Sequence, residues 1–172
     1  GAAEWKGFEW KRQWYPLAFV KTTDKDVPHR LELFGEHLVL WWDSLAWRAM
    51  LDECPHRLAP LSEGRIDEAG CIECPYHGWA FEGSSGACTK IPQMEGMGNS
   101  DVRGKCGGTV FRIVERQGLI WVWGERGLSA NQADEGLIPV CEAMEDPAFD
   151  WIDVSRDMPY SADMLIENVI DS

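Results

Sequence analysis

The stretch that decides the fold runs from Cys54 to His77 and reads CPHRLAPLSEGRIDEAGCIECPYH. It begins with a C-x-H motif and, after 17 intervening residues, ends with a C-x-x-H motif. Each motif offers one thiol and one imidazole within a short loop, and the proline after each cysteine stiffens that loop. Gly78 follows the last histidine and allows the chain to turn closely there. The stretch therefore predicts two loops with matched pairs of metal-binding side chains.

Two thiolates and two imidazoles form an uncommon donor set. A [2Fe–2S] cluster has two irons, and in a Rieske centre one iron takes two cysteines while the other takes two histidines. The motifs therefore predict a Rieske-type [2Fe–2S] cluster bound by Cys54, His56, Cys74 and His77. Five largely apolar residues of the same stretch are expected to shield this cluster from water: Leu58, Pro60, Leu61, Tyr76 and Trp79.

A zinc site is the strongest alternative. Cys71 and Cys74 form a C-x-x-C motif, and with Cys54 and one histidine they could make a tetrahedral site. This alternative leaves the other histidine without a role, and it requires Cys71, whose position before the second loop is typical of a buried strand residue. The remaining cysteines match no ligand spacing: Cys88, Cys106 and Cys141.

Composition limits the possible functions further. The chain has 172 residues, of which 45 % are hydrophobic, which suits one domain, or one domain and the beginning of a second. Its formal net charge of −13 would repel nucleic-acid phosphates, so no nucleic-acid partner is expected. The acidity fits solubility and the docking of a basic electron donor. Cysteines at metal-ligand spacing favour a reducing compartment.

The sequence shows no secretory signal pattern and no apolar run long enough to span a bilayer. It starts at Gly1 without a methionine and stops at Ser172 inside an amphipathic pattern. We expect the chain to be truncated, which leaves room for a targeting segment that has been removed.

Short apolar segments predict an all-β chain followed by one helix. Two hairpins stand out, one around Gly35-Glu36 and one around Gln117-Gly118. Residues 93–108 and 125–148 indicate connections, and residues 162–170 have helical spacing. Strands are expected at 14–19, 31–34, 37–42, 46–51, 71–73, 79–82, 109–115, 118–123 and 150–157.

Several stretches outside the two motifs carry a family resemblance: Trp14-Tyr15-Pro16, Trp41-Trp42-Asp43, Lys90-Ile91-Pro92-Gln93, Met158-Pro159-Tyr160 and Glu167-Asn168. Together with the motifs they resemble the Rieske-type oxygenases of chloroplast pigment metabolism. That family includes pheophorbide a oxygenase, chlorophyllide a oxygenase and the Rieske protein of the chloroplast inner-envelope translocon. The resemblance covers the chain from about residue 8 to its end.

The resemblance implies a Rieske domain of antiparallel sheets over residues 1–150, with a cluster-binding subdomain at about 52–92. Residues 151–172 would begin a truncated α+β catalytic domain, whose mononuclear Fe(II) lies beyond this chain. Respiratory Rieske proteins resemble one another in a disulfide between the two loops and a serine hydroxyl on the cluster, and this chain has neither. Fewer hydrogen bonds should place the reduction potential near the lower end of the Rieske range, roughly −150 mV.

The resemblance also implies an oxygenase that inserts O₂-derived oxygen into a chlorophyll-derived tetrapyrrole such as pheophorbide a. Residues 167–171 are similar to the start of the family's E-N-x-x-D-x-x-H-x-x-x-x-H motif. Asp171 would then carry electrons from His77 to the mononuclear iron of a neighbouring subunit in a homotrimer. A ferredoxin or reductase would supply the electrons. A plastid location and a membrane anchor beyond the C-terminal end are implied as well.

Other functions remain open from sequence. A Rieske ferredoxin-type electron carrier would contain the same two loops. A hydroxylase acting on a linear chlorophyll catabolite, or an enzyme that oxidises a chlorophyllide, would share the same Rieske domain.

Overall fold

The computed structural model describes residues 7–94, 106–127, 130, 133–154, 156 and 158–170. The chain divides into two compact units, residues 1–140 and 141–172, and each is described by itself. The first unit contains strands β1 to β10, and the second contains the short helix η6 (Glu142–Met144) and the helix α2 (Ala162–Ile170). The division agrees with a β-sheet domain followed by a helical segment.

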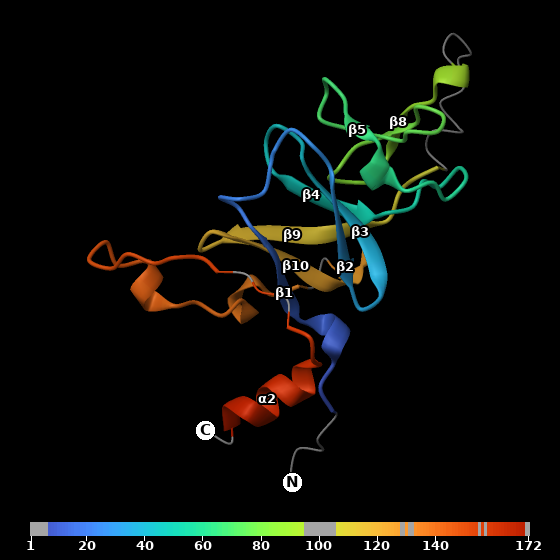
Figure 1. Cartoon of the computed structure of the whole chain (residues 1–172). Coiled ribbons are helices and arrows are strands. Elements are labelled where there is room, and N and C mark those ends of the chain that lie inside the picture. The colour runs from blue at the N-terminus through green and yellow to red at the C-terminus, as the bar shows by residue number, and fades with distance from the viewer. Residues whose placement is uncertain are drawn as a thin grey trace. The chain divides into compact units, whose positions relative to one another are not determined.

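An antiparallel sheet of six strands forms the base of the first unit (Figure 1). Its strand order is β1-β10-β9-β4-β3-β2, so strands from both ends of the unit lie side by side. The strands are β1 (Trp14–Phe19), β2 (His29–Leu33), β3 (Glu36–Trp42), β4 (Trp47–Leu51), β9 (Val110–Arg116) and β10 (Leu119–Arg126).

Two hairpins of this sheet are closed by the same kind of turn. Phe34 and Gly35 have φ angles of 53° and 76°, and Gln117 and Gly118 have φ angles of 51° and 74°. Two successive left-handed residues match the right-handed twist of the strands that such a turn joins. Both predicted hairpins are confirmed, although the first turn lies one residue earlier than expected.

Strand β3 is buried on both faces because alternate side chains enter different cores. Leu38 and Leu40 pack against side chains from other strands of the six-stranded sheet, such as Phe111 and Ile120, in one core. Val39 and Trp41 point the other way, into a core that contains Cys54 and the cluster-binding subdomain. One strand thus connects the base sheet to the predicted metal-binding region.

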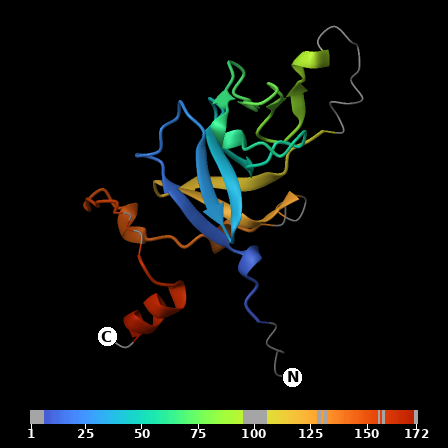
Figure 2. The ribbon, with the colours of Figure 1, turned by 45° about the vertical axis from the view of Figure 1, so that its right-hand side comes forward.

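A second antiparallel sheet of four very short strands builds the cluster-binding subdomain, in the order β5-β6-β7-β8. Its residues lie together at one end of the six-stranded sheet in both views (Figures 1 and 2). The predicted strands at 71–73 and 79–82 are present in shorter form, whereas β5 and β8 were not predicted. The strands are β5 (Arg65–Ile66), β6 (Ile72–Glu73), β7 (Ala80–Phe81) and β8 (Cys88–Lys90).

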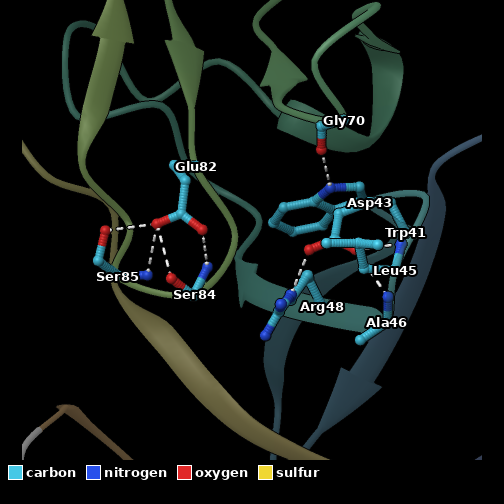
Figure 3. A network of polar contacts seen from close by, with 9 residues as sticks. All are labelled: Trp41, Asp43, Leu45, Ala46, Arg48, Gly70, Glu82, Ser84 and Ser85. Carbon is cyan, nitrogen blue, oxygen red and sulfur yellow. Dashed lines mark hydrogen bonds and ion pairs between the residues drawn. The ribbon is translucent and has the colours of Figure 1, made fainter.

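The two sheets meet closely at Gly70. The indole N–H of Trp41 donates a hydrogen bond to the Gly70 carbonyl at 3.0 Å (Figure 3). Asp43 lies against the same glycine, and its carboxylate accepts hydrogen bonds from the backbone of Leu45 and Ala46. A Cβ on Gly70 would lie 2.3 Å from the Asp43 carbonyl oxygen, and Gly70 also has a φ of +80°. Only glycine fits this contact without moving backbone.

Replacing Gly70 with alanine should therefore destabilise the protein by at least about 2 kcal/mol, because strain and a backbone clash add. Chemical denaturation measures this change in the free energy of unfolding. Gly118→Ala is the matched control, since Gly118 has a φ of +74° but open space around its Cβ position. The control should cost only the strain of about 1 kcal/mol. Equal losses in the two variants would contradict a close contact at Gly70.

The second unit corrects one prediction and confirms another. Residues 151–154 form no strand, and Trp151, Ile152 and Val154 are exposed. A β-rich composition alone does not make a strand, because a strand needs a hydrogen-bonding partner, and none lies beside these described residues. The predicted helix at 162–170 coincides with α2. The proposed start of a second domain at residue 151 stays a prediction.

Candidate metal centre

The first cluster loop, residues 54–59, is closed by two backbone hydrogen bonds. The Cys54 N–H donates to the Ala59 carbonyl at 2.9 Å, and the Leu58 N–H donates to the Cys54 carbonyl at 2.8 Å. Leu58 has a left-handed φ of 55°, a conformation that a leucine rarely adopts, and its side chain is exposed. The loop keeps this strain at its tip, where His56 lies.

The second cluster loop, residues 74–79, repeats the same backbone arrangement. The Cys74 N–H donates to the Trp79 carbonyl at 2.8 Å, and the Gly78 N–H donates to the Cys74 carbonyl at 3.1 Å. Gly78 stands four residues after its cysteine, as Leu58 does, and has a φ of 68°. The C-x-H and C-x-x-H motifs therefore fold as two copies of one loop, each with a cysteine at its base.

A buried carboxylate precedes each loop. Asp52 and Glu73 are the buried charged residues of the described chain. Asp52 accepts hydrogen bonds from the backbone N–H and the hydroxyl of Ser62, both at 2.7 Å. Glu73 pairs with Arg65 and with Lys90, whose Nζ lies 3.1 Å from its carboxylate. Sequence reasoning missed both, because an acidic residue beside a loop usually indicates a solvated surface.

The two cysteines come together at the base of the loops. Cys54 and Cys74 are 1 % and 3 % exposed and belong to the same buried core cluster, where the Cys74 thiol is close enough to affect the pKa of Cys54. Burial raises the pKa of Cys54 to about 11. The backbone N–H of His56 opposes this rise in pKa, and the neighbouring Cys74 thiol adds to it. A pair of thiolates in this place requires the positive charge of a bound metal.

The two histidines come together at the loop tips. The ring centroids of His56 and His77 are 4.6 Å apart, and Trp79 stacks on His56 with centroids 4.5 Å apart and planes at 6°. The Nδ1 atom of His56 is buried and has no hydrogen-bond partner. A buried ring nitrogen without a partner is costly unless it binds something, and a metal ion would satisfy it.

These observations test the fit of the expected cofactor. The four predicted ligands come together as a sulfur pair and an imidazole pair, which suits two irons better than one ion. Within the described residues, no three His, Cys, Asp or Glu side chains converge on one point. Cys71, which the zinc alternative requires, instead accepts a hydrogen bond from the Thr89 hydroxyl at 3.6 Å. The donor set fits a [2Fe–2S] cluster and does not support zinc.

The expected shielding of this centre is only partly present. Leu61 is fully buried and Trp79 covers the ring of His56. Leu58, in contrast, is 68 % exposed, so its assignment as a shielding residue was wrong. Tyr76 is 60 % exposed, but its ring centroid lies 4.0 Å from that of His77, so it covers one side of that ligand. Both lie in the turns of the cluster loops, where no neighbouring strand covers them. The imidazole side of the centre therefore lies nearer to solvent than the sulfur side.

The motif at residues 167–171 was assigned to electron transfer from the sequence alone. Glu167 and Asn168 lie on α2 in the second unit. Asp171, the predicted electron bridge, lies outside the residues that the structure describes. None of the described helices combines the length and the apolar character needed to cross a bilayer.

Glu82 closes the turn between β7 and β8, beside the cluster-binding core. Its carboxylate accepts hydrogen bonds from the backbone N–H and the hydroxyl of both Ser84 and Ser85 (Figure 3). Partial burial opposes ionisation, but the hydrogen bonds from Ser85 and Ser84 outweigh it and lower the pKa of Glu82 to about 2. The ordinary value for glutamate is 4.5, so the folded state favours the ionised form.

Replacing Glu82 with glutamine should cost stability that depends on pH. Because the folded pKa is depressed, the ionised carboxylate stabilises the fold above about pH 4.5, and this contribution is lost as pH falls through about 2. The difference in unfolding free energy between wild type and Glu82→Gln should be constant near neutral pH and should shrink between these values. Denaturation series across this range measure it. A difference that does not change with pH would contradict the prediction.

The fold and the paired donors define a class: β-sheet iron–sulfur proteins whose cluster draws on both cysteine and histidine. The chain belongs to the Rieske [2Fe-2S] domain family, whose sequence pattern matches residues 13–111. This match confirms the predicted family and the [2Fe–2S] cofactor.

Relatives narrow the family to oxygenases. The chain is 46 % identical over 171 residues to pheophorbide a oxygenase, chloroplastic, of Oryza sativa subsp. japonica, covering 95 % of this chain and 32 % of that protein. It is 40 % identical over 169 residues to flavonoid 8-hydroxylase 2, chloroplastic, of Ocimum basilicum, covering 95 % and 32 %. The chain thus spans about a third of the length of the curated relatives it matches.

A crystal structure of dicamba monooxygenase has the same fold. The two structures superpose with a TM-score of 0.67 and 34 % sequence identity. The superposition covers 80 % of this chain and 41 % of the dicamba monooxygenase chain. The antiparallel all-β Rieske fold that the sequence predicted is thereby confirmed. The three relatives carry three different substrates in their names, so relationship alone does not determine the substrate of this protein.

Proposed function

We propose that this chain is the electron-accepting Rieske domain of an oxygenase, with Cys54 and Cys74 on one iron and His56 and His77 on the other. The observation that carries the proposal is the pairing of the donors, sulfur with sulfur and imidazole with imidazole. Two loops that are 17 residues apart in sequence, with the same hydrogen bonds, produce this pairing. Relatives that are oxygenases and hydroxylases support the wider role.

The bound cluster would take up one electron at a time from a donor protein and pass it on. Cys54 and Cys74 hold the inner side in a water-free core, where their thiolates would be balanced by iron. His56 and His77 lie at the outer side, partly exposed, so they form the natural path for electrons to enter and leave. Trp79 keeps the ring of His56 in a fixed orientation by stacking on it.

The role of the whole protein follows by analogy with its relatives. We propose that a ferredoxin or reductase supplies the electrons, and that Asp171 relays them from His77 to a mononuclear Fe(II) of a neighbouring subunit in a trimer. O₂ would be activated there. A chlorophyll-derived tetrapyrrole such as pheophorbide a is the proposed substrate, on the basis of the 46 % identity. The chloroplastic relatives support a plastid location, and a membrane anchor would lie outside this chain.

Metal analysis of the purified chain tests the cluster and its ligands. We expect about two irons and two acid-labile sulfides per chain, and a reduced-state EPR signal of the Rieske type rather than of the all-cysteine type. One zinc per chain and no EPR signal would overturn the proposal.

A second experiment separates an oxygenase from an electron carrier. The full-length protein, supplied with a ferredoxin, its reductase and ¹⁸O₂, should incorporate labelled oxygen into pheophorbide a. Labelling of a flavonoid instead would replace the proposed substrate and keep the oxygenase. Cluster reduction without labelling of any tetrapyrrole or flavonoid would favour the electron carrier.

A further inference from the structure

A row of charged residues crosses the four-stranded sheet beside the second cluster loop. Arg65 on β5 is in register with Glu73 on β6, Glu73 with Ala80 on β7, and Ala80 with Lys90 on β8. Residues directly opposite one another on paired strands place their side chains on the same face. Because Ala80 is small, the Lys90 ammonium reaches across it to the Glu73 carboxylate at 3.1 Å. The guanidinium of Arg65 contacts the other carboxylate oxygen.

Burial differs sharply within this charged row of Arg65, Glu73 and Lys90. The side chain of Glu73 is 7 % exposed, whereas those of Arg65 and Lys90 are 74 % and 42 % exposed. A buried carboxylate is tolerated only when it is paired, and Glu73 is paired on both oxygens. The carboxylate is therefore the fixed member of the row, and it holds two cations that could otherwise move in water.

The charged row faces the same space as a predicted cluster ligand. A cavity of about 530 Å³ is lined by the row together with Cys74, His77 and Gly78. Glu73 directly precedes Cys74, and a Cβ placed on Gly78 would lie 4.0 Å from a Glu73 carboxylate oxygen. The buried Glu73 carboxylate would act on a neighbouring redox centre with little screening, whereas the exposed cations would be screened more strongly.

We propose that the charged row of Arg65, Glu73 and Lys90 acts through its charges on the centre held by the second cluster loop and thereby sets the reduction potential. The proposal rests on the ligand roles of Cys74 and His77 proposed above. The redox step is the gain of one electron from a donor protein, which makes the centre more negative by one charge. A nearby carboxylate disfavours that added charge, and nearby cations favour it.

The sign of the shifts distinguishes this role from a structural one. Glu73→Gln removes the least screened charge of the row, so the reduced state should become more stable and the potential should rise. Lys90→Gln removes a cation, so the potential should fall. An ion pair that only supports the sheet would loosen the loop in either variant, and both potentials would then move in one direction or not at all.

The experiment measures midpoint potentials of the cluster-loaded protein by spectroelectrochemical titration at pH 7, in low and high salt. Each variant should shift the equilibrium constant for reduction roughly tenfold, or ~59 mV for one electron, in opposite directions. The shift for Glu73→Gln should persist in high salt, because the carboxylate is buried. The shift for Lys90→Gln should shrink, because its ammonium is partly exposed.

Glu135→Gln is the matched control. Glu135 pairs with Arg112 of the six-stranded sheet at 2.6 Å, so this variant removes the same charge from an ion pair outside the cluster-binding subdomain. It should leave the potential unchanged. Shifts of the same sign, or shifts below twofold, in Glu73→Gln and Lys90→Gln would overturn the role of the charged row. If Glu73→Gln does not fold, the sign for Lys90→Gln decides. Absence of a cluster from the wild type would instead overturn the proposed ligands.

Discussion

Cys74→Ser is expected to yield a colourless protein that holds no iron–sulfur cluster. A serine hydroxyl replaces a thiolate that would bind iron, and it leaves the buried Cys54 sulfur without its partner. Iron content should fall from about two per chain to near zero, and the visible absorption and the reduced-state EPR signal should disappear with it. Metal analysis and absorption spectroscopy of the purified variant measure the loss.

Cys71→Ser provides the control for this loss. Cys71 is also buried and lies three residues before Cys74, but its sulfur contacts the Thr89 hydroxyl rather than Cys54. The control should keep its iron and its colour at a modest cost in stability. Retention of iron in Cys74→Ser, or loss of iron in Cys71→Ser, would show that the sulfur ligands have been assigned wrongly.

His77→Cys is expected to retain a cluster of a different type. A thiolate would replace a neutral imidazole, so the centre would carry one more negative charge in both redox states. The potential should fall from the Rieske range of about −150 to +300 mV toward the roughly −400 mV of all-cysteine clusters. The absorption and EPR spectra should change together with the potential, and all three are measured on the reconstituted protein.

The control for this variant introduces the same residue elsewhere. The side chain of His37 is exposed on β3, and the hydrogen bond that His37 accepts from the Asp52 N–H uses its backbone carbonyl, which the substitution retains. His37→Cys should leave the spectra and the potential as they are. If the spectra and potential of His77→Cys also stayed unchanged, His77 would not be a ligand.

Local chemistry explains what could be predicted. The motifs at 54–56 and 74–77 lie in short loops, so residue types and spacing were enough to name candidate ligands before any fold was known. The hairpin turns were predictable for the same reason, since Gly35 and Gly118 satisfy a backbone requirement of the turn itself. Helix α2 followed from its own periodicity.

Other predictions failed because the deciding partner lay elsewhere in the chain. Residues 150–157 have the composition of a strand, but a strand forms only where another strand accepts its hydrogen bonds. Strands β5 and β8 are only two and three residues long, too short to show an alternating pattern, and they exist because β6 and β7 lie between them. Leu58 is apolar enough for a shield, yet the first cluster loop holds it exposed to solvent.

The sequence by itself was enough to name the four candidate donor side chains, the two loops that carry them and the existence of the two hairpins, because each depends on residues close together in the chain. Only the tertiary structure showed that the two loops pack together, with both cysteines in one buried core and both histidine rings side by side, because the loops are separated in sequence. It also decided that Asp52 and Glu73 are buried. Whether a carboxylate is solvated or enclosed depends on its surroundings in the fold, and Glu73 is paired with Arg65 from the neighbouring strand β5 and with Lys90, which reaches across β7 from β8.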